Sequence, residues 1–231
     1  MADELDAPTS NDSLYLARVG EVSALRPFMQ GDVFEEVEVP GLDDGPGLAL
    51  ILTHPCSMRN GPHLADRLLV ARVIPAPHVP LPQWSSGHFR TMPLPDLDGP
   101  NSGSHYAAIF ENVGATPSMA LTPEKRRACL DPYGIGLLQQ RFVHYLTRVV
   151  VPLSQLSLVC APVFAEADLL EEWVEASDAR GIDLPTAEEQ FDSFIRSTDH
   201  AGGASFQEDL KDPLKRAAVT RAVRRRIDVG L

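Results

Sequence analysis

The sequence is poor in cysteine, with only Cys56, Cys129 and Cys160 among 231 residues. An odd and sparse set indicates reduced thiols rather than a disulfide framework, and it predicts a cytoplasmic protein. The chain has no CxxC pair and no Cys/His spacing typical of zinc sites. We therefore predict neither a metal nor any other cofactor.

Targeting segments are also missing from the sequence. The N-terminus has neither the basic stretch nor the apolar stretch of a signal peptide. No apolar run reaches the length expected of a membrane-spanning segment, so no membrane partner is expected. Internal repeats are absent as well.

Positive charge is scarce relative to negative charge. Lys and Arg number 20 against 32 Asp and Glu, which gives a net charge of −12. This balance excludes a protein that coats nucleic acid over its whole surface, although it permits a local basic patch. One such patch is predicted at residues 211–226, where seven basic residues accompany Asp212.

Three strands are predicted between residues 27 and 74. Residues 33–39 alternate imperfectly, as a strand with one solvated face does, and residues 68–74 form the third strand. Between them, residues 48–52 are uninterruptedly apolar, which predicts a central strand with Leu50 and Leu52 buried. A fourth strand is expected at 105–110, after a long loop rich in Pro and Gly.

Helical patterns dominate the second half of the chain. Thr122-Pro123-Glu124 is a start signal that predicts a short helix to Leu130. The remaining expected elements are helices at 13–25, 136–148, from 162, from 185 and at 213–227, a turn at 112–114 and a strand at 147–151.

The order of elements in residues 27–115 resembles the MazF/PemK toxin family. The matching pieces are Gly31-Asp32, residues 48–53 and residues 69–75. The resemblance implies a small curled β-barrel of the Src-homology-3 type that cleaves single-stranded RNA. The third strand ends in Ile74-Pro75-Ala76, so the Thr that follows Pro-Ile in that family has no counterpart here.

We accordingly predict an α+β fold, in which a small Src-homology-3-like β-barrel carries a C-terminal helical appendage. The expected divisions are an acidic and partly disordered segment at 1–26, a barrel domain at 27–155 and the helical appendage at 156–231.

One polar turn follows the predicted central strand and contains His54, Cys56 and Arg59. A Cys beside a His and an Arg is a candidate catalytic nucleophile with a depressed thiol pKa. The alternative is a Cys packed at a strand end, with His54 hydrogen-bonded to the backbone. Convergence of several histidines would be needed for a metal site, and the sequence does not establish it.

Arginines supply the candidate nucleic-acid contacts. Residues 141, 144 and 148 fall on one face of a predicted helix, which places two arginines together. The alternatives are a solvated or ion-paired face and, at the C-terminus, cations that complement a helix dipole. The candidate set is Arg126, Arg127, Arg141, Arg148, Arg224 and Arg225.

Two functional hypotheses follow. The first is a toxin-like barrel protein directed at nucleic acid, with RNA as the partner and RNA cleavage as the activity. The second is a non-catalytic module that binds a protein partner or forms a homodimer.

Overall fold

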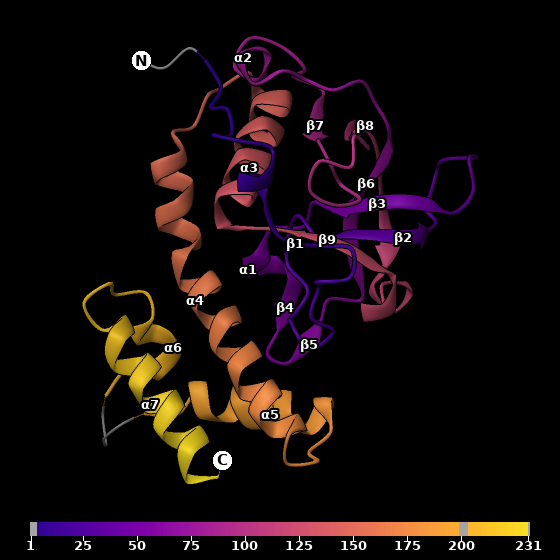
Figure 1. Cartoon of the computed structure of the whole chain (residues 1–231). Coiled ribbons are helices and arrows are strands. Elements are labelled where there is room, and N and C mark those ends of the chain that lie inside the picture. Colours follow the sequence, from indigo (N-terminus) through magenta and orange to yellow (C-terminus); the bar gives the residue numbers. More distant parts are fainter. Residues whose placement is uncertain (1–3, 199–202, 231) are drawn as a thin grey trace. The chain divides into compact units, whose positions relative to one another are not determined.

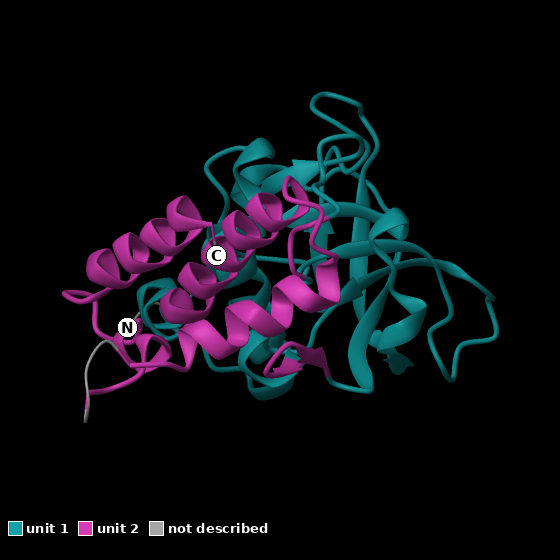
Figure 2. Cartoon of the chain, turned by 90° about the horizontal axis from the view of Figure 1, so that it is seen from below, with its two compact units in different colours: residues 1–24, 28–58, 65–159 teal, residues 25–27, 59–64, 160–231 magenta. Residues whose placement is uncertain are grey.

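A computed structural model describes residues 4–198 and 203–230 (Figure 1). The chain divides into two compact units (Figure 2). Unit 1 contains residues 1–24, 28–58 and 65–159, and unit 2 contains residues 25–27, 59–64 and 160–231. The division falls inside one long helix, after Val159.

Unit 1 is built on a curled, half-barrel sheet of seven antiparallel strands. The protein is therefore a mixed α+β fold. The strand order is β1-β9-β2-β3-β6-β8-β7. Their bounds are β1 Tyr15–Arg18, β2 Val33–Val37, β3 Gly47–Ile51, β6 Arg67–Pro75, β7 Thr91–Leu94, β8 Tyr106–Pro117 and β9 Arg126–Leu130.

The centre of the sheet is β3, as its unbroken apolar run predicts. Leu50 and Leu52 are buried, which confirms their assignment to the core. Leu50 lies opposite Val33 on β2 and Ala71 on β6, so both long edges of β3 are paired. A strand with two paired edges and no polar alternation is typical of a sheet interior.

Helix α3, Pro132–Thr147, belongs to unit 1 and begins with a cap. The Asp131 carboxylate accepts a hydrogen bond from the Gly134 N–H, and Pro132 occupies the first turn, where its missing N–H costs nothing. Gly134 is required here because a Cβ atom would clash with the Leu14 carbonyl oxygen. Short helices α1, Pro55–Met58, and α2, Leu81–Trp84, complete the regular helices that lie wholly in this unit.

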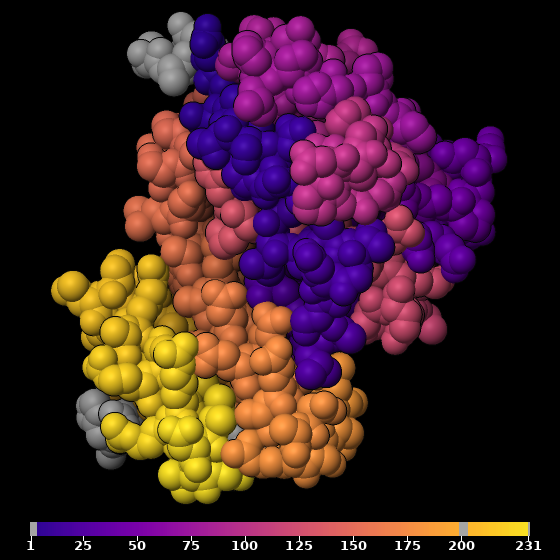
Figure 3. Space-filling view, in the orientation of Figure 1, coloured from indigo at the N-terminus to yellow at the C-terminus, as the bar shows by residue number. Residues whose placement is uncertain are grey.

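Residues 4–18 run along unit 1. Leu5 is buried, and the Asp6 N–H donates to the Gln140 side chain. Asn11 donates to Asp96 in the Pro- and Gly-rich loop, and the space-filling view shows the indigo N-terminal segment against that magenta loop (Figure 3). The first three residues of the predicted disordered segment lie outside the described residues.

Unit 2 is helical. It contains most of α4, Leu153–Asp178, together with α5, Leu184–Ile195, α6, Phe206–Asp209, and α7, Arg216–Val229. A two-stranded hairpin, β4 Arg59–Asn60 and β5 His63–Leu64, also belongs to it. The apolar faces meet in one core, whose buried members are Leu169, Trp173, Val174, Ala187, Phe191, Ile195, Phe206, Leu210, Val219 and Val223.

Two predicted helices are wrong. Within the first, at 13–25, residues 15–18 form β1, and Ala17 pairs with Cys129 of β9. The second, at 124–130, shrinks to a single 3₁₀ turn at Pro123–Lys125, and β9 follows at once. In both places pairing with a distant strand overrides the local helical signal.

The predicted strand at 147–151 and the predicted turn at 112–114 are also wrong. Helix α3 ends at Arg148, in a left-handed conformation, and residues 149–151 have no regular structure. Strand β8 continues through Gly114, which pairs with Val70, and a Cβ there would lie 2.6 Å from the Pro40 carbonyl oxygen. This glycine serves close backbone approach and not a turn.

By length and composition alone, α4 could cross a membrane, so the sequence-based expectation was too strict. The second half of α4 contributes Leu169, Trp173 and Val174 to the core of unit 2. The apolar window of the helix is only 22% buried, but one such helix is weak evidence for a membrane span.

Candidate functional site

The polar turn after β3 is fixed by its own backbone. The Thr53 hydroxyl accepts a hydrogen bond of 2.7 Å from the Leu69 N–H, and the Thr53 N–H donates to the Leu69 carbonyl. Helix α1 then begins at Pro55 as a single turn. These contacts place His54 and Cys56 at one end of the central strand.

His54 and Cys56 are neighbours in this turn. The His54 Nδ1 accepts a 3.3 Å hydrogen bond from the Cys56 backbone N–H, and the Cys56 side chain is exposed. Burial lowers the pKa of His54, so the imidazole is uncharged at neutral pH. An uncharged imidazole does not stabilise a thiolate as an imidazolium would, and the turn lacks this source of cysteine activation.

Arg59 belongs to unit 2, in the hairpin β4–β5. Its guanidinium donates to the Pro62 carbonyl at 3.3 Å and lies 3.7 Å from the Glu188 carboxylate. Burial raises the pKa of Glu188, while Arg59 opposes that rise. These contacts give Arg59 a role in attaching the hairpin to α5.

Arg126 and Arg127 follow one another on β9, but neither offers a simple phosphate contact. Arg126 is buried, pairs with Asp32 at 3.2 Å and donates to the Ser23 carbonyl. Arg127 bridges Glu35 and Asp98, at 2.8 Å from each carboxylate. Ion pairs inside unit 1 therefore neutralise both side chains.

Arg141 is fully buried, which makes its prediction as a nucleic-acid contact wrong. Its guanidinium donates to the carbonyl oxygens of four residues, at 2.7–3.0 Å, and it lies 5.2 Å from the centre of the Trp84 ring. Burial lowers its pKa to about 10, so it remains charged at neutral pH. The four acceptors are Trp84, Gly87, His88 and Thr91.

The last three predicted arginines are exposed, and one of them is ion-paired. Arg148 ends α3 and is exposed. Arg224 on α7 pairs with Glu172 through two hydrogen bonds of 2.9 and 2.7 Å. Arg225, also on α7, is exposed. Within residues 4–198 and 203–230, no group of three His, Cys, Asp or Glu residues is arranged to hold a metal ion.

The structure adds a surface that the sequence analysis missed. Four large apolar side chains of unit 1 are 56–66% exposed at the end of α3 and the beginning of α4: Leu146, Val149, Leu158 and Val159. A sequence signal for it exists, because no Asp, Glu, Lys or Arg occurs between Arg148 and Glu166. We call these four residues the α3–α4 apolar surface.

Comparison with known proteins does not assign this chain to a class. No protein-family model matches the sequence, and no curated protein matches it either. Function must therefore be inferred from the residues themselves.

Proposed function

We propose that the protein is a non-catalytic protein–protein interaction module, built on a Src-homology-3-like barrel, that self-associates through the α3–α4 apolar surface. The observation that carries this proposal is the exposure of Leu146, Val149, Leu158 and Val159, the last three of which lie in the uncharged stretch after Arg148. Exposed apolar residues that gather in one patch are typical of interaction sites, and these four come from the short segment 146–159.

The uncharged face permits a second copy of the chain as the occupant. A net charge of −12 makes two copies repel one another over most of their surfaces. Residues 149–165 carry no charged side chain, so two such faces can meet without that repulsion. An isologous contact of this kind also buries the leucines and valines that unit 1 leaves exposed.

Sedimentation of the purified chain tests the proposal. We expect a concentration-dependent dimer of the 25.2 kDa chain, and we expect Leu158→Asp to convert it to a monomer. Met119→Asp is the matched control, because Met119 is an exposed apolar residue of unit 1 outside this surface. A wild-type monomer at every concentration, or equal effects of the two substitutions, would contradict self-association.

The second candidate function is RNA cleavage by a MazF/PemK-like toxin. It is supported by the exposed Cys56 thiol beside His54, at the end of the central strand of a curled antiparallel sheet. The test is incubation with labelled RNA and DNA, with and without divalent metal. Cleavage that Cys56→Ser and His54→Gln abolish, but His63→Gln retains, would favour the nuclease over the interaction module.

A further inference from the structure

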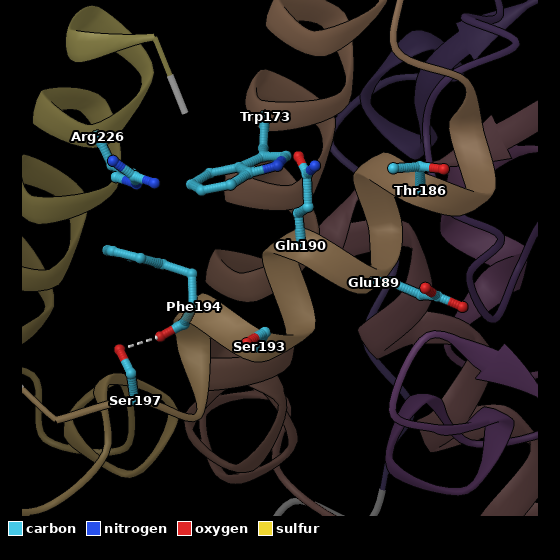
Figure 4. Close-up of a pocket in the computed structure, with 8 residues that line it drawn as sticks. All are labelled: Trp173, Thr186, Glu189, Gln190, Ser193, Phe194, Ser197 and Arg226. Carbon is cyan, nitrogen blue, oxygen red and sulfur yellow. Dashed lines mark hydrogen bonds between the residues drawn. The ribbon is translucent and has the colours of Figure 1, made fainter.

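Unit 2 contains a groove of about 550 Å³, a volume typical of ligand sites (Figure 4). It is lined by α4, α5 and α7. Trp173 of α4 and Phe194 of α5 supply its aromatic side chains, and Arg226 reaches it from α7. The predicted functional residues do not line it.

The polar wall of the groove follows one face of α5. Thr186, Gln190 and Ser193 recur at helical spacing, and Ser197 follows in the turn after α5 ends at Ile195. At 1.5 Å per residue, residues 186–197 extend over roughly 16 Å. An extended peptide rises about 3.3 Å per residue, so the wall matches about five residues of such a chain.

The aromatic floor contains an unsatisfied donor. Trp173 is 2% exposed, and its indole Nε1 has no hydrogen-bond partner. Its ring is held by Phe191 and Phe194, at centroid distances of 5.8 and 5.4 Å. The Nε1 atom is itself buried, so the ring offers the groove its apolar surface and not its donor.

Charge gives the groove a direction. Figure 4 shows the Arg226 guanidinium extending from α7 toward the Trp173 ring, with Glu189 on the opposite side of the groove. Arg226 is exposed and has neither an ion pair nor a hydrogen bond to its side chain within the described residues, whereas Arg224 is paired with Glu172. One end of the groove therefore favours an anion and the other disfavours it.

We propose that this groove binds a short extended peptide segment that carries a carboxylate side chain. The carboxylate pairs with Arg226, an apolar side chain of the peptide packs on the rings of Trp173 and Phe194, and the Ser193 hydroxyl bonds the peptide backbone. Glu189 excludes a second acidic residue from the far end. This inference rests on the proposed function, since it gives the interaction module a class of protein partner.

The two tryptophans of the chain make a direct test by NMR. The Trp84 indole is buried in unit 1 and donates to the Val79 carbonyl, so its resonance is an internal control. The full chain is titrated with pools of pentapeptides that have Asp, Asn or Lys fixed at one end. We expect the Asp pool to shift the Trp173 indole resonance saturably, and the Asn and Lys pools and the Trp84 resonance to show little change.

Arginine variants supply the matched comparison. Arg226→Gln should weaken binding of the Asp pool roughly tenfold, because it removes a charge-assisted hydrogen bond, and Arg225→Gln should not. An unchanged Trp84 resonance and a single sharp Trp173 resonance in each free variant verify that both fold. Equal shifts by the Asp and Asn pools, or equal affinities of the two variants, would overturn the proposal. Competition with an oligothymidylate is the last test. If it bound wild type more tightly than the Asp pool does, and lost that binding in Arg226→Gln, the groove would be a nucleic-acid site and the proposal would be overturned.

The same titration separates this site from self-association. Leu158→Asp changes the α3–α4 apolar surface and leaves the groove intact, so it should retain the Trp173 shift. A chain that remains monomeric but shows an Arg226-dependent shift of the Trp173 resonance supports peptide binding in the groove and contradicts self-association. A chain that dimerises but shows no such shift supports self-association and contradicts peptide binding in the groove.

Discussion

Three arginines of unit 1 and two of α7 in unit 2 have opposite environments. Arg72, Arg126 and Arg141 are at most 5% exposed, and backbone carbonyl oxygens accept hydrogen bonds from each of them. Arg225 and Arg226 on α7 are exposed. The difference shows that buried guanidinium groups organise unit 1, whereas α7 presents exposed cations to a partner.

Irregular backbone explains why unit 1 buries arginine. A guanidinium offers five N–H donors in a fixed plane, and loops present carbonyl groups that no ladder satisfies. Arg141 gathers four such carbonyls from residues 84–91, and Arg126 fixes the Ser23 carbonyl. The long Pro- and Gly-rich loop is thus held by a side chain from α3.

The strongest test of this comparison is Arg126→Met. It leaves the Asp32 carboxylate buried without its partner, and we expect a loss of about 3–5 kcal/mol in the free energy of unfolding. Urea denaturation measures this loss. Adding Asp32→Asn should recover part of it, and a loss below about 1 kcal/mol would contradict the structural role.

The pH dependence of that variant has a definite sign. Burial raises the pKa of Asp32, and Arg126 opposes the rise. Without Arg126 the folded state favours the protonated carboxyl more strongly, so its stability falls as the pH rises above the ordinary value of 3.8. The deficit of Arg126→Met relative to wild type should therefore be smaller at pH 5 than at pH 8.

A smaller effect is expected for Arg141→Lys. Lysine keeps the charge but cannot reproduce the planar fork, so some of the four carbonyls lose their donor. We expect a loss of about 2–3 kcal/mol, together with faster amide exchange in residues 84–91. Arg148→Lys on the same helix is the control, because Arg148 is exposed. Equal exchange in the two variants would argue against an anchoring role.

The sequence predicts the centre of the sheet because its information is local. The apolar run at 48–52 and the positions of Leu50 and Leu52 are enough to identify a buried strand. The pairing of β1 with β9 is not local, since it joins residues 15–18 to 128–130. Neither segment signals its partner, and a helical interpretation of each is equally consistent with its composition.

The candidate sites were harder to predict than the fold. Arg141 and Arg225 are the same residue type in helices, and only the folded chain shows that one is enclosed by carbonyls and the other is exposed. The groove joins Trp173 to Arg226 from different helices, so no motif precedes it in the sequence. The uncharged stretch at 149–165 was the one local signal available for a surface.

The smallest effect is expected for Arg224→Ala, which removes an exposed ion pair on α7. The hydrogen bonds from Arg224 lower the pKa of Glu172 below its ordinary value of 4.5. A lowered carboxyl pKa stabilises the fold above the unfolded-state value, and this contribution is lost as the pH falls through the folded-state value. The small difference in unfolding free energy between wild type and Arg224→Ala should thus be present at pH 7 and disappear as the pH falls below 4.5.

Salt and a neighbouring substitution distinguish this pair from the buried arginines. About 1 M salt should abolish the effect of Arg224→Ala at pH 7, because exposed charges are screened within a few ångströms. The Arg126→Met deficit should persist, since neither charge of that pair faces solvent. Arg225→Ala, measured in parallel, should match wild type at every pH. If its unfolding curve moved as far as that of Arg224→Ala, the α7 cations would stabilise the fold, and they would no longer be the cations available to a partner.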